Sequence, residues 1–309
     1  MRILFICHPY PNYVPDLLLH GLRKIIGDDV VDFPRKDILY DGILGQSYLD
    51  PIPGLMADDS RVDRQDLDAK LASKYFDFVL CDIRSFVEYF PRLRRHPVPL
   101  VLVDGEDSPQ RISVAGPYII LRRETDGCDS SIPLPMAMPT EVMDWIDQYR
   151  DQPKTHSVGF LGSISDPARA KMLGELVRLF PDARLQCWEK DAQWQGRDNY
   201  YRTLQGCRTV LTLPGAGYDT FRYWEHAACN AAHVAQRMPI LIPNDFRDGA
   251  EIARFTTVRE LAYGIERILD REGEWQAFAA RSRAWLRAHH TTEQRALQTL
   301  DRIKAAFLL

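Results

Sequence analysis

The sequence predicts an α/β protein built from two Rossmann-like, doubly wound domains that face a cleft, with helices at the C-terminus. Three observations predict this class. The chain has 309 residues, which suits two domains of about 100–200 residues each. Short apolar runs alternate with helical patterns along the whole chain. The runs are rich in β-branched residues and nearly continuous, which is typical of parallel strands buried on both faces.

The first half of the chain contains a series of expected strands. The pattern "PDLLLHGLRKIIG" predicts a helix that stops at Gly27, so the chain opens with a βαβ unit. A proline-rich stretch at 132–155 is expected to connect the two domains. The expected strands of this half are 2–7, 30–33, 76–83, 99–104 and 118–122.

A second βα series follows the connection. Thr257 and Glu260 form a capping-box pattern at the start of one helix. The tail, 274–308, is expected to form helices broken near 289–292. The expected strands are 157–162, 183–188, 209–214 and 239–243, and the expected helices are 166–180, 199–207, 219–236 and 257–270. We expect an N-terminal domain over 1–150, a C-terminal domain over 151–285, and a final helix over 286–309 that packs back toward the N-terminal domain.

Composition narrows the functional classes. A formal net charge of -4 argues against a dedicated DNA-binding protein, which is usually basic. The start "MRILFIC" has no cleavage site of a signal peptide, and no apolar run is long enough to span a membrane. The six cysteines form no CxxC pair and several lie in apolar runs, so neither a zinc cluster nor a disulfide framework is expected. We therefore expect a cytoplasmic protein.

A glycine turn before a helix, in "PGAGYDTFRYWEHAAC", is the strongest functional signal. The start of a helix after a glycine turn presents free N–H groups and a positive dipole end, which suits a phosphate. Arg222 adds a bidentate anion donor, and Glu225 could accept hydrogen bonds from ribose hydroxyls. The alternative is that Arg222 and Glu225 form an ordinary surface ion pair one turn apart. The candidate donor-binding residues in this segment are Gly215, Gly217, Tyr218, Asp219, Thr220, Arg222 and Glu225.

The string "YRTLQGCRTVLTLPGAGYDTFRYWEHAACNAAHVAQRMPILIPND" resembles the nucleotide-sugar-binding half of GT-B fold glycosyltransferases, closest to the exostosin-like and spore-maturation CgeB-type groups. The resemblance extends over about 155–300 and includes "VGFLGSISDPAR" and "HHTTEQRA". It implies that Arg222 contacts the donor phosphate, that Glu225 contacts the donor ribose, and that Gly162 and Ser163 lie near the diphosphate. It also implies a reaction without a metal cofactor. Gly217 departs from the pattern, because many retaining members carry a glutamate there.

Trp188, at the end of an expected strand, is a candidate for stacking on the nucleotide base, with a core or rim tryptophan as the alternative. In the N-terminal half, Asp104 and Glu106 follow a strand end in "VDGED", and one could be the general base. The alternatives there are a divalent-metal site and a plain Asp-Gly turn. His8 and Asp16, after the first strand, are further candidates for the base, although Asp16 could instead cap the helix that starts at Leu17.

The sequence therefore predicts an enzyme that moves a sugar from a nucleotide-diphosphate sugar to a hydroxyl acceptor. The acceptor classes left open are a saccharide, a protein and a hydroxymethylated base in DNA. For DNA, "RLRRH" at 92–96 and the pair Arg122 and Arg123 could line a groove. The alternative is a non-catalytic nucleotide- or sugar-binding protein on a degenerate version of this fold. A dehydrogenase is disfavoured because no GxGxxG follows the first strand.

Overall fold

The computed structural model describes residues 1–40, 55–56, 59–107, 114, 116, 118–164, 167–188, 196–271 and 273–307, without the side chains of Cys187 and Trp188. The chain divides into two compact units. Unit 1 comprises Met1–Pro139, Ile240–Pro243 and His290–Leu309, and unit 2 comprises Thr140–Pro239 and Asn244–His289. The first division therefore comes before the boundary expected after residue 150.

Unit 1 is built on a parallel sheet of six strands in the order β2-β1-β3-β4-β5-β6. The residues of β1 and β3 are all buried, as the continuous apolar runs predict for a strand covered on both faces. The strands are β1 (Ile3–Ile6), β2 (Val30–Phe33), β3 (Phe78–Asp82), β4 (Leu100–Asp104), β5 (Ile119–Arg122) and β6 (Ile132–Pro133). All five strands expected in the first half are confirmed within a few residues.

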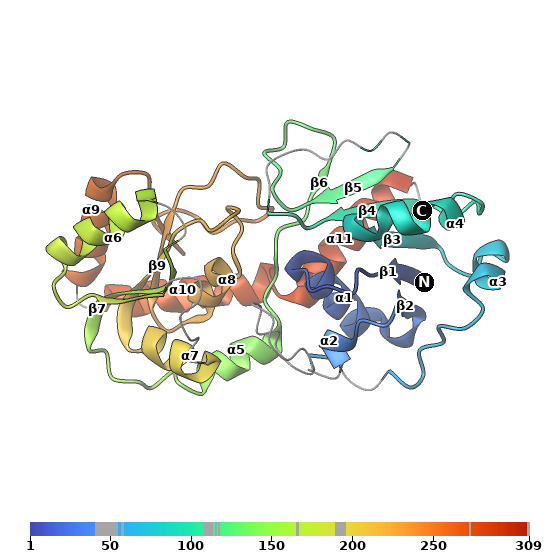
Figure 1. Ribbon diagram of the computed structural model, residues 1–309. Helices are drawn as coiled ribbons and strands as arrows, with labels where there is room; N and C mark the ends of the chain where they lie inside the picture. The colour runs from blue at the N-terminus through green and yellow to red at the C-terminus, as the bar shows by residue number, and fades with distance from the viewer. Residues whose placement is uncertain are drawn as a thin grey trace. The chain divides into compact units, whose positions relative to one another are not determined.

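The first and last helices of unit 1 lie side by side (Figure 1). A Cβ atom at Gly21, on the first helix, would lie 2.0 Å from the backbone oxygen of Thr292. Glycine is therefore needed for this close approach, and His20 Nδ1 hydrogen-bonds Thr292 Oγ1 at 2.9 Å beside it. The helices of unit 1 are α1 (Tyr13–Ile26), α2 (Asp37–Tyr40), α3 (Leu67–Ala72), α4 (Phe86–Leu93) and α11 (Thr292–Phe307).

Unit 2 contains a second parallel sheet, of five strands in the order β11-β10-β9-β7-β8. One apolar core joins the strands to helices α6, α9 and α10 through side chains such as Leu176, Ile265 and Phe278. The strands are β7 (His156–Ser163), β8 (Arg184–Trp188), β9 (Cys207–Thr212), β10 (Ala232–Gln236) and β11 (Ala253–Phe255). The two parallel sheets confirm the predicted fold class.

The helices of unit 2 are α5 (Thr140–Asp147), α6 (Pro167–Leu179), α7 (Arg197–Gln205), α8 (Phe221–Ala228), α9 (Val258–Leu269) and α10 (Glu274–His289). The cap expected before α9 is present, because Thr257 Oγ1 accepts a hydrogen bond from Glu260 N at 3.2 Å. The break expected near 289–292 separates α10 from α11. No helix in the described ranges is long and apolar enough to cross a membrane.

Two expected elements of unit 2 are wrong. The helix predicted over 219–236 ends at Ala228, and the strand lies at Ala232–Gln236 instead of 239–243. An alanine-rich run favours helix by intrinsic propensity. Here tertiary pairing wins, because Ala232–Ala235 align with Thr209–Thr212 of β9 and all four side chains are buried. Residues 240–243 join unit 1, where Leu241 N donates to Thr125 O at 2.8 Å.

Candidate functional site

The carboxyl end of β7 in unit 2 brings Gly162 against Arg222, the first arginine of α8. A Cβ atom at position 162 would lie 2.7 Å from Arg222 Nη2, so only glycine leaves room for the guanidinium there. The Cζ atom of Arg222 is 5.6 Å from the centroid of the Phe160 ring. Arg222 Nε is buried and has no hydrogen-bond partner. The site therefore holds a partly buried cation whose charge no carboxylate of the described chain neutralises, which is what an anion-binding site requires.

A second arginine, Arg169 on α6, reaches the same strand end. Its Nη1 donates to Ser163 O at 2.6 Å, and its Cζ lies 6.0 Å from the centroid of Phe160. Arg169 is 5% exposed. Nothing in the local sequence pattern singles out this residue, although it ends the string "VGFLGSISDPAR". Two guanidiniums thus converge on Phe160, Gly162 and Ser163.

The glycine turn leads directly into α8, as predicted. Gly215 N donates to Gly217 O at 2.8 Å, and a Cβ atom at Gly215 would lie 3.2 Å from Thr220 Cγ2. Thr220 occupies the N-cap position, but its hydroxyl does not cap the helix, and the buried Oγ1 has no hydrogen-bond partner. Asp219 is fully buried and accepts a hydrogen bond from Trp224 Nε1 at 2.8 Å. Tyr218 is half-buried.

The start of α8 therefore places two groups that can bind an anion beside Arg222, the first N–H groups of the helix and the hydroxyl of Thr220. Neither that hydroxyl nor Arg222 Nε has a hydrogen-bond partner among the described residues. Gly215, Gly217 and Thr220 all lie in the segment directly before α8. The Asp219 carboxylate accepts the hydrogen bond from the Trp224 indole, and its expected contact with the donor stays a prediction.

Glu225 lies one turn further along α8 and is 5% exposed. Its Oε1 accepts hydrogen bonds from Arg197 Nη1 at 3.2 Å and Tyr201 OH at 2.8 Å, and its Oε2 accepts one from Tyr200 OH at 3.2 Å. The surface ion pair with Arg222 is thus not formed. Instead Glu225 joins α8 to α7 through a buried ion pair.

Two buried histidines lie close together near the start of α8, His226 one turn after Arg222 on the same helix and His233 on β10. The hydroxyl of Thr212, at the end of β9, contacts His226 Nδ1 at 2.8 Å and His233 Nε2 at 3.0 Å. Burial lowers the pKa of His226 well below its usual value and lowers the pKa of His233 to about 3. Both rings are therefore neutral at physiological pH, and they leave the charge of Arg222 undisturbed.

Trp188 ends β8, the strand beside β7, but its side chain lies outside what the structure describes. Its expected stacking on a nucleotide base stays a prediction. Glu189 and the end of the acidic loop, 108–110, also lie outside the described residues. Within the described ranges, no group of three or more His, Cys, Asp or Glu side chains is arranged to hold a metal ion.

In unit 1, Asp104 ends β4 and is 4% exposed. Its Oδ1 accepts a hydrogen bond from Glu106 N at 3.3 Å, and its Oδ2 is 3.6 Å from Arg122 Nε. Burial raises the pKa of the Asp104 carboxyl above its usual range. A carboxylate with a raised pKa is a better proton acceptor near neutral pH, and Asp104 stays a candidate for the general base. Glu106, in contrast, forms an ion pair with Arg84.

Asp16 and His8 are also found at this edge of the sheet. Asp16 Oδ2 accepts a hydrogen bond from Asn12 N at 3.0 Å, and Asp16 Oδ1 pairs with Lys36 Nζ at 2.9 Å. Burial raises the pKa of Asp16 to about 6. Asp16 therefore stabilises the start of α1, although that helix begins at Tyr13 and not at Leu17. His8 is half-buried, and its Nδ1 accepts a hydrogen bond from Tyr10 N at 3.2 Å.

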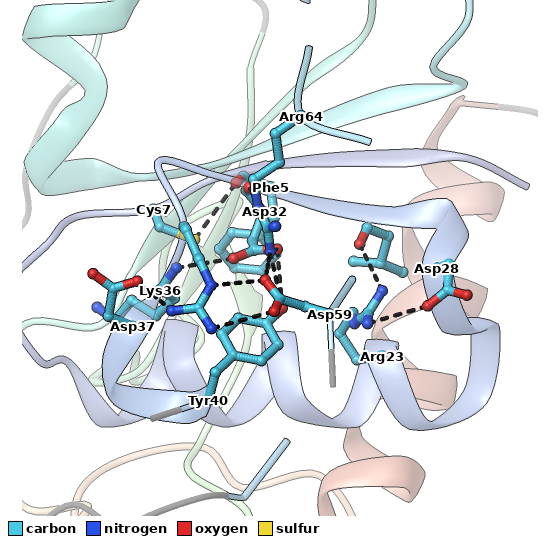
Figure 2. A network of polar contacts seen from close by, with 12 residues as sticks. Phe5, Cys7, Arg23, Asp28, Asp32, Lys36, Asp37, Tyr40, Asp59 and Arg64 are labelled. Atoms are coloured by element: carbon cyan, nitrogen blue, oxygen red, sulfur yellow. Dashed lines mark hydrogen bonds and ion pairs between the residues drawn. The ribbon is translucent and has the colours of Figure 1, made fainter. Parts of the chain in front are cut away.

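Asp32, at the end of β2, forms the centre of a neighbouring network (Figure 2). Its Oδ1 accepts hydrogen bonds from Tyr40 OH at 3.0 Å and Arg64 Nη2 at 2.6 Å, and its Oδ2 accepts one from Lys36 N at 2.9 Å. Lys36 Nζ also donates to His8 O at 2.6 Å. These contacts use both oxygens of Asp32 and hold the segment after β2 against the sheet. We assign this network to the fold.

The proposed basic groove for DNA does not form from the two arginine clusters. Arg122 and Arg123 are each 5% exposed, and they form ion pairs with Asp104 and Asp107. Residues 92–96 form the end of α4 and the segment after it, and this helix leaves the carboxyl end of β3 and returns toward the start of β4. In a parallel sheet, the end of such a helix lies at the opposite edge from its beginning. The local sequence does not indicate this arrangement, because burial and the sheet edge are decided by tertiary structure.

Comparisons with known proteins agree with this fold. Residues 168–301 match the family model described as "Glycosyl transferase-like". A search of curated proteins finds no match to the chain. The solved structure of Anabaena Alr3699/HepE in complex with UDP and glucose is similar, with a TM-score of 0.61 and 14% identity over 98% of this chain and 99% of that one. A glycosyltransferase from Rickettsia africae has a TM-score of 0.50 and 11% identity over 99% and 98% of the two chains. The chain therefore has the two-domain α/β fold of these structures, the GT-B fold, and its residues 168–301 resemble the glycosyl transferase-like family.

Proposed function

We propose that the protein transfers a sugar from a nucleotide-diphosphate sugar to a hydroxyl acceptor, with the donor held by unit 2. The observation that carries this proposal is the guanidinium of Arg222, which lies against Gly162 and has no counter-ion among the residues that the structure describes. Arg169, the start of α8 and the hydroxyl of Thr220 add further donors for a diphosphate. The similar Anabaena protein is in complex with UDP and glucose, so UDP-glucose is the first donor to test.

The reaction breaks the bond between the anomeric carbon and the diphosphate oxygen, and the electron pair stays on the diphosphate. Donors that are already in place stabilise this leaving group as its charge develops. The acceptor oxygen forms the new bond to the anomeric carbon and gives its proton to the carboxylate of Asp104. We propose that the protein's own cations take the place of a metal ion. Full turnover in excess EDTA supports this point, and a requirement for added Mg²⁺ or Mn²⁺ contradicts it.

We propose that Glu225 contributes to recognition of the donor ribose. Its Oε2 accepts one hydrogen bond from the protein, from Tyr200, and so has room for a second from a ribose hydroxyl. The competing role is structural, because Glu225 also pairs with Arg197. Glu225→Gln keeps the shape and tests both roles. If Glu225→Gln lowers the affinity for UDP more than it lowers the affinity for inorganic diphosphate, and the melting temperature is unchanged, Glu225 contacts the ribose.

Titration calorimetry with uridine, guanosine and adenosine diphosphates tests the donor site. We expect at least one to bind, and Arg222→Ala to weaken its binding about 10- to 100-fold, the usual cost of losing charge-assisted hydrogen bonds. Arg259→Ala is the matched control, because Arg259 is an exposed arginine on α9. Absence of binding to all three nucleotides, or equal effects of the two variants, rejects the donor site.

The acceptor class stays open to a saccharide, a protein or a modified base in DNA. Salt-dependent retardation of DNA on a gel would favour DNA. A protein that binds the nucleotide but never turns over the donor sugar would instead be a binding protein on this fold.

We also propose a reducing compartment such as the cytoplasm, because Cys7, Cys81, Cys128, Cys207 and Cys229 are free thiols.

A further inference from the structure

The short loop that follows β1, from His8 to Pro11, is anchored through its main chain. Lys36 Nζ donates hydrogen bonds to His8 O at 2.6 Å and to Tyr10 O at 2.8 Å. Arg84 Nη1 donates to Pro11 O at 3.3 Å, and Tyr10 N donates to His8 Nδ1 at 3.2 Å. Lys36 is 1% exposed, so it holds the loop from inside the unit. These contacts use main-chain atoms of Tyr10, and they fix the position from which its ring projects.

Two large apolar side chains are exposed at this edge of the sheet. Of those that the structure describes in unit 1, Val87 and Tyr10 are the most exposed, at 84% and 60%. Val87 lies in the first turn of α4, the helix that follows β3. Ser85, directly before α4, donates from Oγ to Cys7 O at 3.0 Å, so α4 begins beside the loop that carries Tyr10. Exposed apolar side chains that gather at one place indicate a binding surface, whereas single ones do not.

The segment that carries Tyr10 also contacts the turn after Asp104, the candidate base. A Cβ atom at Gly105, the next residue, would lie 2.7 Å from Asn12 Oδ1 and 2.8 Å from Pro15 Cδ. Asn12 follows Tyr10 by two residues. The exposed ring and the candidate base therefore belong to adjoining segments at the carboxyl edge of one sheet, which is where ligands bind in folds of this kind.

The lysines and arginines of this edge are already paired. Each one that the structure describes at the end of a strand of this sheet, or in the segment directly after it, forms an ion pair with a carboxylate. The pairs are Arg35 with Asp59, Lys36 with Asp16, Arg84 with Glu106, Arg122 with Asp104, and Arg123 with Asp107. A phosphate or carboxylate ligand needs cations that are not already neutralised. This edge therefore suits an uncharged ligand better than an anionic one.

We propose that this edge of unit 1 binds an uncharged saccharide as the acceptor, with one sugar ring stacked on the face of Tyr10. The face of an aromatic ring carries partial negative charge. The C–H bonds on one side of a sugar ring carry partial positive charge, so the two surfaces attract each other. A loop that is already anchored loses little conformational entropy when the ligand binds. The inference rests on the proposed function and narrows its acceptor class.

A nucleobase can also stack on an aromatic side chain, whatever the base. DNA, however, binds mainly through its phosphates, and these would meet no unpaired lysine or arginine among the described residues that end or directly follow these strands. The charges at this edge therefore favour a saccharide over DNA.

Titration followed by nuclear magnetic resonance tests the stacking without any turnover. The neutral probes are methyl β-glucoside, methyl β-galactoside and methyl α-mannoside, and methyl β-glucuronide is the charged counterpart of the first. Tyr10→Ala removes the ring, whereas Tyr10→Phe keeps it. Tyr263→Ala is the matched control, because Tyr263 lies on α9 of unit 2 and is 66% exposed. A single-stranded oligothymidylate tests DNA on the same variants.

We expect at least one neutral glycoside to bind the wild type, and Tyr10→Ala to weaken that binding about three- to tenfold, as for loss of one aromatic contact. Tyr10→Phe and Tyr263→Ala should bind the glycoside like the wild type. The glucuronide should bind more weakly than the glucoside.

Three results would overturn the inference. The first is that no neutral glycoside binds the wild type. The second is an equal affinity in Tyr10→Ala and Tyr263→Ala, or an equal loss in Tyr10→Ala and Tyr10→Phe. The third is that the glucuronide or the oligothymidylate binds more tightly than every neutral glycoside and loses affinity in Tyr10→Ala.

Calorimetry with UDP on the same variants separates this inference from the proposed function. Glycoside binding that depends on Tyr10, without UDP binding, supports the saccharide site and rejects only the proposed function. UDP binding without glycoside binding rejects only the saccharide site. Where UDP-glucose is turned over, Tyr10→Ala should raise the KM for the glycoside and leave the affinity for UDP unchanged.

Discussion

The guanidinium of Arg222 occupies the space that a side chain at position 162 would fill, with Nη2 2.7 Å from where a Cβ atom would stand. The two residues come from different βα units, and they meet because β7 and β9 are neighbours in the sheet and α8 follows β9. Arg222 can therefore take this position only because residue 162, near the end of β7, is a glycine. If Arg222 binds the donor diphosphate, Gly162 contributes by leaving room for it.

Gly162→Ala tests this relationship. The atom in the way is the end of a flexible side chain, so we expect the protein to fold and Arg222 to move. Nucleotide affinity should fall about tenfold, which corresponds to roughly 1.4 kcal/mol. Gly174→Ala, within α6, is the control, because a Cβ atom there meets nothing within 4 Å. It should leave binding intact and stabilise the helix by about 0.5–1 kcal/mol. Equal nucleotide affinity in the two variants would contradict the role of Gly162.

Asp104→Asn should reduce transfer about 10²- to 10⁴-fold, as for removal of a general base, with little change in donor affinity. Because burial raises the pKa of Asp104, the wild-type rate should fall with decreasing pH through a pKa above the usual aspartate value. Arg122 nearby lowers this pKa, whereas Glu106 and Asp82 raise it. A pH–rate profile measures the effect. Glu106→Gln, which removes a half-buried partner of Arg84, should be much milder, and an equal loss in both variants would reject Asp104 as the base.

Acid should destabilise unit 2 through His226 and His233. Burial lowers the pKa of both rings, so in the folded state they stay neutral while in the unfolded state they bind protons. The contribution of the two neutral rings to the free energy of unfolding is therefore fully present above the unfolded pKa of about 6.5. It is lost as the pH falls below that value, at about 1.4 kcal/mol per pH unit for each ring. Urea unfolding between pH 7 and pH 4 measures the slope. His233→Gln should flatten it, whereas His156→Gln, at a half-buried histidine outside this pair, should not.

Asp32→Asn should destabilise unit 1 by about 1–3 kcal/mol, because it weakens buried hydrogen bonds to Arg64 and Tyr40. Asp37→Asn is matched to it, since Asp37 pairs with Arg35 in the same network, with its side chain 69% exposed. Ion pairs at the surface contribute about 0–1 kcal/mol to the free energy of unfolding, so Asp37→Asn should change the stability of the protein little. Thermal unfolding compares the two variants, and an equal effect would show that burial of Asp32 adds nothing.

Most strands could be predicted from the sequence because their apolar runs are short, continuous and bounded by turn residues. The segment 219–236 could not, because alanine is compatible with a helix and with a buried strand alike. Only pairing with β9 makes Ala232–Gln236 a strand. Arg169 was missed for a related reason, because nothing in the local pattern distinguishes a buried charge from a solvated one.

The sequence by itself determined the α/β class, the glycine turn before α8, and the acidic residues that follow the strands, since these depend on local periodicity and turn chemistry. The partner of each charge was decided only by the tertiary structure. Arg222 lies against Gly162, Glu225 pairs with Arg197, and Asp16 pairs with Lys36. The physical reason is that strand order brings loops distant in sequence to one sheet edge, where burial makes the choice of partner energetically decisive.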